Sequence, residues 1–175
     1  MRKVTTAGCA LSLLAISAVA SAQTTTSLPD VNPTNVSLRV GGVFATDGPL
    51  RNQQKLWFGI GAEYQFPRDI IKDSPTYFSL DAVAQSGAGG HGNFFPICLN
   101  QRFYFDQTGS RRAYFFFGAG VVIMNVTSSN TTGVLRTGFG YEFTQNVFVE
   151  SSFVAGGQVD GFQPTSIGFY LGYRF

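Results

Sequence analysis

Eight charged side chains stand inside otherwise apolar segments of the chain, and their chemistry suits them to ion pairing. Four are arginines and four are carboxylates, so the set is electrically neutral. A charge removed from water is costly unless an opposite charge compensates it. The sequence therefore predicts buried ion pairing among Arg39, Glu63, Asp81, Arg102, Arg136, Glu142, Glu150 and Arg174.

Side chains for nucleophilic or metal chemistry are sparse. His91 is the one histidine of the chain, and it lies in a glycine-rich stretch, residues 87–92, with no serine at a spacing that would hold a base against its nucleophile. A single histidine excludes a histidine-based metal cluster, and this stretch does not lead from a strand into a helix as a phosphate-binding loop does. Cys98 is predicted to pack inward as a small reduced side chain. We therefore predict no catalytic residue, no metal site and no cofactor.

Residues in the segments that carry the charges alternate in polarity, which predicts β-strands. In the last eleven residues, apolar and aromatic side chains fall on one face of a strand, and small, polar or charged ones fall on the other. Eight segments show this alternation, each near the length that a tilted strand needs to cross a bilayer, with turn-forming clusters between them. The predicted strands are residues 36–44, 56–66, 77–86, 94–105, 113–125, 134–143, 147–155 and 166–175.

The side on which the charges fall distinguishes a membrane barrel from a soluble fold. When the apolar face alone sets the orientation of each strand, all eight charges point to the opposite face. A soluble sandwich or calyx would explain the alternation, but not a phenylalanine-rich face repeated on every strand. A membrane barrel turns that face toward lipid and keeps a polar interior. We therefore predict an all-β fold, an eight-stranded antiparallel up-and-down transmembrane β-barrel.

The interior of such a barrel is just wide enough for side chains to fill it. We expect Arg39 beside Glu63 and Asp81 beside Arg102 across adjacent strands, with Arg174 joining near the end that carries the chain termini. Glycines on the inward face would leave room for the long arginines, which favours a plugged lumen over an open pore. These glycines are Gly59, Gly61, Gly118, Gly120, Gly138, Gly140, Gly168 and Gly172.

The N-terminus has the pattern of a cleaved secretory signal peptide. Arg2 and Lys3 precede an apolar stretch, and Ala20-Ser21-Ala22 supplies a small-x-small cleavage site. The signal holds 2 of the 12 basic residues, so the remaining 10 balance the 10 acidic ones and no nucleic-acid surface is indicated. We predict a signal peptide over 1–22, a flexible N-terminal lead over 23–35 and the barrel over 36–175, with both barrel termini on the periplasmic side.

Residues 36–175 resemble the small eight-stranded outer-membrane barrels of Gram-negative bacteria, a family that includes the OmpA barrel domain, OmpX and the opacity-type proteins. The most specific likeness is the C-terminus, where Phe169, Leu171, Tyr173 and Phe175 alternate as in the signal read by the outer-membrane assembly machinery. The resemblance implies a location in the cell outer membrane. It also implies lipopolysaccharide and other outer-membrane lipid as surroundings, and the assembly machinery as the partner in biogenesis.

Three functions are compatible with these patterns. The favoured one is a non-enzymatic outer-membrane barrel that supports the envelope or presents short extracellular loops to a partner. A small channel or a carrier of hydrophobic molecules would need a continuous lumen, which the predicted plug opposes. A lipid A-modifying enzyme would need a serine, a histidine and an acid at lipid depth, which His91 does not provide. We expect a monomer that binds no nucleic acid.

Overall fold

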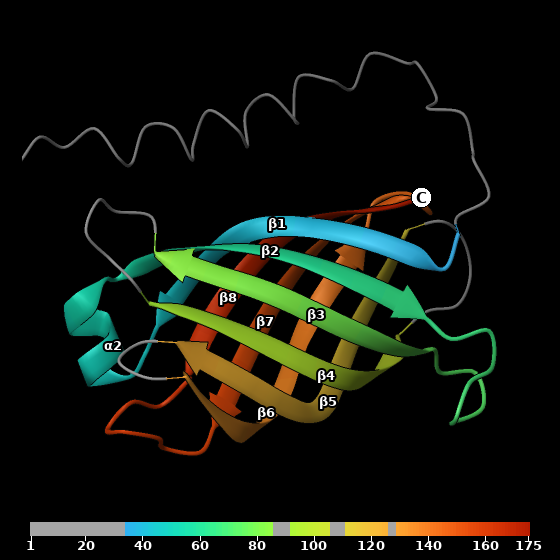
Figure 1. Cartoon of the computed structure of the whole chain (residues 1–175). Helices are drawn as coiled ribbons and strands as arrows, with labels where there is room; N and C mark the ends of the chain where they lie inside the picture. The colour runs from blue at the N-terminus through green and yellow to red at the C-terminus, as the bar shows by residue number, and fades with distance from the viewer. Residues whose placement is uncertain (1–33, 86–91, 106–110, 126–128) are drawn as a thin grey trace, which may run out of the picture. The chain divides into compact units, whose positions relative to one another are not determined.

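The chain forms a closed barrel of eight antiparallel strands, which confirms the predicted architecture. The computed structural model describes residues 34–85, 92–105, 111–125 and 129–175. Each strand pairs with the next in sequence, and β8 closes the barrel against β1 (Figure 1). The elements are β1 (Val36–Ala45), α2 (Gly48–Gln53), β2 (Leu56–Gln65), β3 (Thr76–Gln85), β4 (Asn93–Tyr104), β5 (Arg112–Asn125), β6 (Ser129–Glu142), β7 (Val147–Gly156) and β8 (Ser166–Arg174).

The predicted signal peptide and most of the predicted lead lie outside the described residues, so these boundaries stay predictions. Thr34 and Asn35, the last residues of that lead, continue the strand pairing. The Thr34 N–H donates to the carbonyl of Phe175, and the Gln65 N–H donates to the carbonyl of Asn35. Among the described residues, no helix is long and apolar enough to cross a membrane.

The outer and inner faces of the barrel have the reverse polarity of a soluble protein. All eight predicted lumen charges are at most 6% exposed, whereas every strand exposes large apolar side chains. An apolar outer wall around a polar interior is the pattern of a barrel surrounded by lipid. One such outward side chain from each strand in turn is Leu38, Phe58, Leu80, Leu99, Phe117, Phe139, Phe153 and Phe169.

The two ends of the barrel differ. We call the end where β1 begins and β8 ends the base, and the opposite end, which carries residues 46–55 and 157–165, the cap end. Exposed aromatic rings pack edge to face at the base, and aromatic rings at this level are typical of the girdle at a membrane interface. These pairs are Tyr64–Phe66, Tyr141–Phe143 and Tyr173–Phe175.

A short helix occupies the first connection, where the sequence indicated only a turn. Asp47 caps α2 by accepting a hydrogen bond from the backbone N–H of Leu50, and Pro49 occupies the first turn. Six residues are too few to show a helical period, which is why the sequence pattern missed this element.

The strand boundaries agree with the predicted ones to within one residue, except at the start of β6. β6 begins at Ser129, because the polar residues 129–133 pair with 121–125 of β5 instead of forming a turn.

Pro96 lies within β4, where the pairing to β3 is interrupted between Leu80–Ile97 and Val83–Phe94 without a change of register. Proline lacks the N–H that the ladder would need at this point.

Candidate functional site

Arg39 is buried in the lumen and binds three carboxylates at once. Its Nη1 donates to Glu63 at 2.5 Å and to Glu150 at 2.7 Å, while its Nη2 and Nε donate to Asp81 at 2.7 and 3.0 Å. The guanidinium is a planar fork of donors, so it can hold several carboxylates in fixed directions. Arg39 and Glu63 are therefore neighbours, as predicted.

Strand register explains why Asp81 reaches Arg39. Gly61 pairs with Arg39 on one side and with Asp81 on the other, so the three residues lie at one level of the barrel. A Cβ at Gly61 would overlap the Asp81 carboxylate and lie 2.8 Å from Arg39 Nε. Because Gly61 has no side chain, Arg39 and Asp81 can contact each other across β2.

The predicted pair Asp81–Arg102 is wrong. The pairs Leu80–Ile97 and Val83–Phe94 place Asp81 opposite Pro96. Pro96 is six residues before Arg102, so Asp81 and Arg102 are separated by roughly 20 Å along the strands. Arg102 instead donates to Glu63 at 3.0 Å. Arg136 completes the central network by donating to Glu150 at 2.5 Å and to the Ser79 hydroxyl at 2.8 Å.

A second cluster surrounds Glu142 at the base. Arg174 donates to Glu142 at 3.0 Å, Arg112 donates at 2.6 Å, and the Tyr104 hydroxyl donates at 2.6 Å. Arg112 was not predicted, because it precedes the apolar alternation of its strand. Arg112 is paired with Glu142 in the β5–β6 ladder. Only the strand register would have assigned Arg112 to this cluster.

Aromatic rings that the sequence reasoning missed fill the space between the charges. Arg102 lies over the rings of Tyr77 and Tyr114, 4.5 and 4.6 Å from their centroids, and Arg39 lies 5.0 Å from the Tyr170 ring. Cations stack favourably on aromatic faces where water is excluded. The guanidinium groups are therefore held by rings as well as by carboxylates.

Most inward glycines make room for these rings rather than for arginines. A Cβ at Gly140 would overlap the Tyr114 ring, and one at Gly172 would overlap the Phe148 ring. Among the glycines expected to accommodate arginines, only Gly61 has an arginine among its nearest atoms. These ring positions could have been predicted from inward glycines that lie opposite bulky inward residues on the neighbouring strand. That comparison requires the strand register, which the sequence pattern does not give.

We predict that Arg102 couples energetically more strongly to Glu63 than to Asp81. In a double-mutant cycle, Arg102→Ala and Glu63→Gln should be non-additive by about 1–3 kcal/mol, because they remove the two ends of one buried pair. Arg102→Ala with Asp81→Asn should show a clearly smaller coupling, because these two side chains are connected only through Glu63 and Arg39. The measurement is the free energy of unfolding in urea, and equal coupling in both cycles would contradict this assignment.

The cap end of the lumen is apolar. Trp57, Phe94 and Val122 are buried there together with Cys98, the free cysteine that was predicted to point inward. Leu50 of α2 reaches the same cluster and is 1% exposed, and Phe162 packs against it. The lumen thus contains an apolar layer near the cap end and an ion-paired layer toward the base.

The two described connections at the cap end are bonded to each other. The Asp47 carboxylate accepts from the backbone N–H of Gln163 at 3.4 Å as well as from Leu50, and the Thr46 N–H donates to the carbonyl of Thr165 at 2.9 Å. Asp160 and Gly161, with φ of 49° and 81°, form the two-residue turn that returns the chain to Phe162. These contacts hold α2 and residues 157–165 together over the apolar layer.

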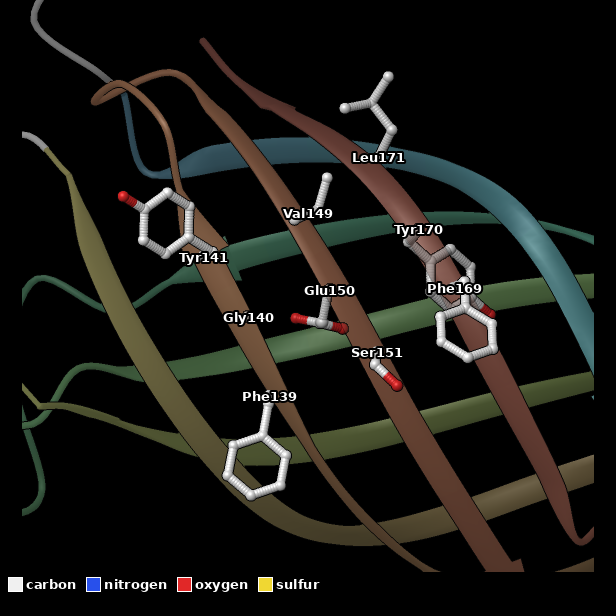
Figure 2. A pocket seen from close by; sticks show the side chains of 9 residues that line it. All are labelled: Phe139, Gly140, Tyr141, Val149, Glu150, Ser151, Phe169, Tyr170 and Leu171. Atoms are coloured by element: carbon white, nitrogen blue, oxygen red, sulfur yellow. The ribbon is translucent and has the colours of Figure 1, made fainter. Parts of the chain in front are cut away.

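A hollow of about 530 Å³ lies on the outer wall over β6, β7 and β8 (Figure 2). The small side chain of Ser151 stands there between its cross-strand partners Phe139 and Phe169. A hydroxyl at this place could serve a lipid-modifying reaction only with a base beside it. The residues that line the hollow include no histidine.

His91, the histidine of the chain, lies outside the described residues. The residue that follows it, Gly92, precedes β4 and lies near Trp57 and Gln85.

Glu150 is next to Ser151 on β7 and is in the lining of the outer hollow, but its carboxylate pairs with Arg39 and Arg136 inside the lumen. Among the described residues, no histidine lines the hollow beside Ser151.

Solved structures with the same architecture are found among bacterial outer-membrane proteins. Neisserial surface protein A shares 14% sequence identity with the chain, with 79% of this chain and 94% of that chain covered and a TM-score of 0.58. The outer membrane enzyme PagL shares 17% identity, with 80% and 97% covered and a TM-score of 0.56. The N-terminal barrel domain of Pseudomonas aeruginosa OprF shares 19% identity over 82% of this chain and all of that domain, with a TM-score of 0.48.

The fold is that of the small outer-membrane β-barrels. The likeness concerns the eight-stranded barrel, because the sequence identities are low. No protein-family model matches the chain, and no curated protein matches it.

Proposed function

We propose that the chain is a non-enzymatic barrel of the cell outer membrane that serves envelope structure or surface interaction. It is exported by the signal peptide over 1–22 and inserted through the terminal pattern of Phe169, Leu171, Tyr173 and Phe175, which the assembly machinery reads. The base then faces the periplasm, and the cap end presents its short connections outward. Lipopolysaccharide and phospholipid surround the apolar wall, and the barrel acts as a monomer.

The observation that carries this proposal is the filling of the lumen by two different layers. A hydrated ion that crossed the barrel would have to displace Trp57 and its apolar neighbours and then break the bonds of Arg39 to its three carboxylates. Opening buried ion pairs strands charges in a medium of low dielectric constant, which is strongly unfavourable. A sealed lumen supports a structural or surface role over a channel or carrier.

Conductance across a planar lipid bilayer tests the sealed lumen. We expect the purified barrel to give no stable current steps, while a general porin inserted into the same bilayer as a control does. Regular single-channel steps that scale with salt concentration would contradict the proposal and favour a small channel.

Mass spectrometry of lipid A tests the non-enzymatic assignment. Lipid A incubated with the barrel in mixed vesicles is expected to keep its mass, because no described histidine lines the hollow at Ser151 and the Glu150 carboxylate is bound to Arg39 and Arg136 inside the lumen. A loss of acyl chains that is abolished by Ser151→Ala would instead identify a lipid-modifying enzyme.

A further inference from the structure

The turn between β2 and β3 exposes two isoleucines at the base. Ile70 is 72% exposed and Ile71 is 44% exposed, and the turn projects beyond the ends of both strands (Figure 1). Large aliphatic side chains gathered at a surface mark an interaction with lipid or with another apolar partner.

Buried hydrogen bonds fix this turn in place. The Ser74 hydroxyl donates to the carbonyl of Arg102 at 2.7 Å, and the Thr76 hydroxyl donates to Gln101 at 2.9 Å. The Thr76 hydroxyl also accepts from the backbone N–H of Ile70 at 3.1 Å. Ser74, Thr76 and Gln101 are all buried, so the exposure of the isoleucines is built into the fold.

A hollow of about 410 Å³ lies beneath the turn on the outside of the barrel. It is lined by Phe66, Pro67, Arg68, Ile70 and Leu99. Leu99 belongs to the outer wall of β4, so the hollow is continuous with the surface that faces lipid. Arg68 is exposed and is the only charged residue in the lining, since Asp69, Lys72 and Asp73 of the same turn are not part of it.

We propose that this hollow binds one anionic glycerophospholipid of the leaflet at the base. An acyl chain lies against Phe66, Ile70 and Leu99, and the Arg68 guanidinium holds the phosphate. Guanidinium groups bind phosphate through paired charge-assisted hydrogen bonds, and basic residues at the membrane surface favour anionic headgroups. Continuity with the lipid-facing wall selects a phospholipid over a protein as the occupant.

Native mass spectrometry of the folded barrel in detergent, titrated with phosphatidylglycerol, tests this site. The wild type is expected to retain one phosphatidylglycerol in preference to phosphatidylcholine, and Arg68→Gln should lower that retention at least fivefold. Ile70→Ser should lower retention of both lipids, because it removes the chain contact. Arg51→Gln changes an exposed arginine on α2 at the cap end and should retain the lipid as the wild type does.

Competition and the matched variants distinguish a lipid site from a bare phosphate site and from non-specific lipid adhesion. Soluble glycerol phosphate should not displace the lipid, because it lacks the acyl chain, and displacement would show a phosphate site without a lipid site. Equal retention by Arg68→Gln and the wild type, or an equal loss in Arg51→Gln, would overturn the proposal. So would a wild type that retains no phospholipid. The proposal rests on the membrane-facing wall and not on the sealed lumen, so a conducting barrel would leave it standing.

Discussion

Replacing Arg39 by methionine is expected to lower the free energy of unfolding by about 3–5 kcal/mol, the cost of removing one partner from a buried ion pair. The Arg39 side chain binds Glu63, Asp81 and Glu150. Without it, three buried carboxylates lose a positive charge that compensates them. Urea unfolding of the protein in lipid vesicles measures this. Trp57, the single tryptophan of the chain, is buried in the apolar layer and reports unfolding by fluorescence.

Two further variants separate the ion pairing from a general effect of losing an arginine. Arg51→Met removes an exposed arginine of α2 and should leave the unfolding midpoint close to that of the wild type. Asp81 has Arg39 as its partner, so Arg39→Met combined with Asp81→Asn should recover part of the loss. Equal midpoints for Arg39→Met and Arg51→Met would contradict the central role of Arg39.

Gly41→Ala should weaken the seam at which β8 closes the barrel against β1. A Cβ at Gly41 would overlap the backbone carbonyl of Phe169 and lie 2.9 Å from Tyr170 Cα, and backbone cannot rotate away as a side chain can. We expect a destabilisation of about 3 kcal/mol, the upper part of the range for overpacked interiors. The readout is the temperature at which the unboiled protein loses its compact mobility on a detergent gel.

Gly48→Ala is the matched control for the seam. A Cβ at Gly48 meets nothing within 4 Å, and alanine is the better helix former, so this variant should keep or raise the transition temperature. If Gly41→Ala melts with the wild type, β1 and β8 are less closely packed than described.

The barrel itself could be predicted because its signal is repeated in every strand. Alternation with period two sets which residues share a face, and the charges then identify the inner one, as Arg39 between Leu38 and Val40 illustrates. Neither step requires knowledge of which residues lie opposite each other. The apolar wall and the buried position of all eight charges follow from local pattern alone.

Partners within the lumen depend on register, which the sequence did not provide. Asp81 was placed beside Arg102 on adjacent strands, although Gly61 brings Asp81 to Arg39 across an intervening strand. Arg112 and Tyr114 lie opposite Glu142 and Gly140 for the same reason. The apolar layer around Trp57 was missed because its residues are inward and apolar, so a rule that treats inward positions as polar overlooks them.

The most direct test of the membrane-facing wall compares tryptophans at two adjacent positions of β2 in vesicles of brominated phospholipid. Trp57 is buried inside the barrel, whereas the side chain of Phe58 is 51% exposed on the outer wall. Bromine should quench the tryptophan of Trp57→Phe combined with Phe58→Trp at least twofold more than it quenches Trp57 of the wild type. Equal quenching of the two proteins, or stronger quenching of Trp57, would contradict a barrel with an apolar wall in lipid and a sealed interior.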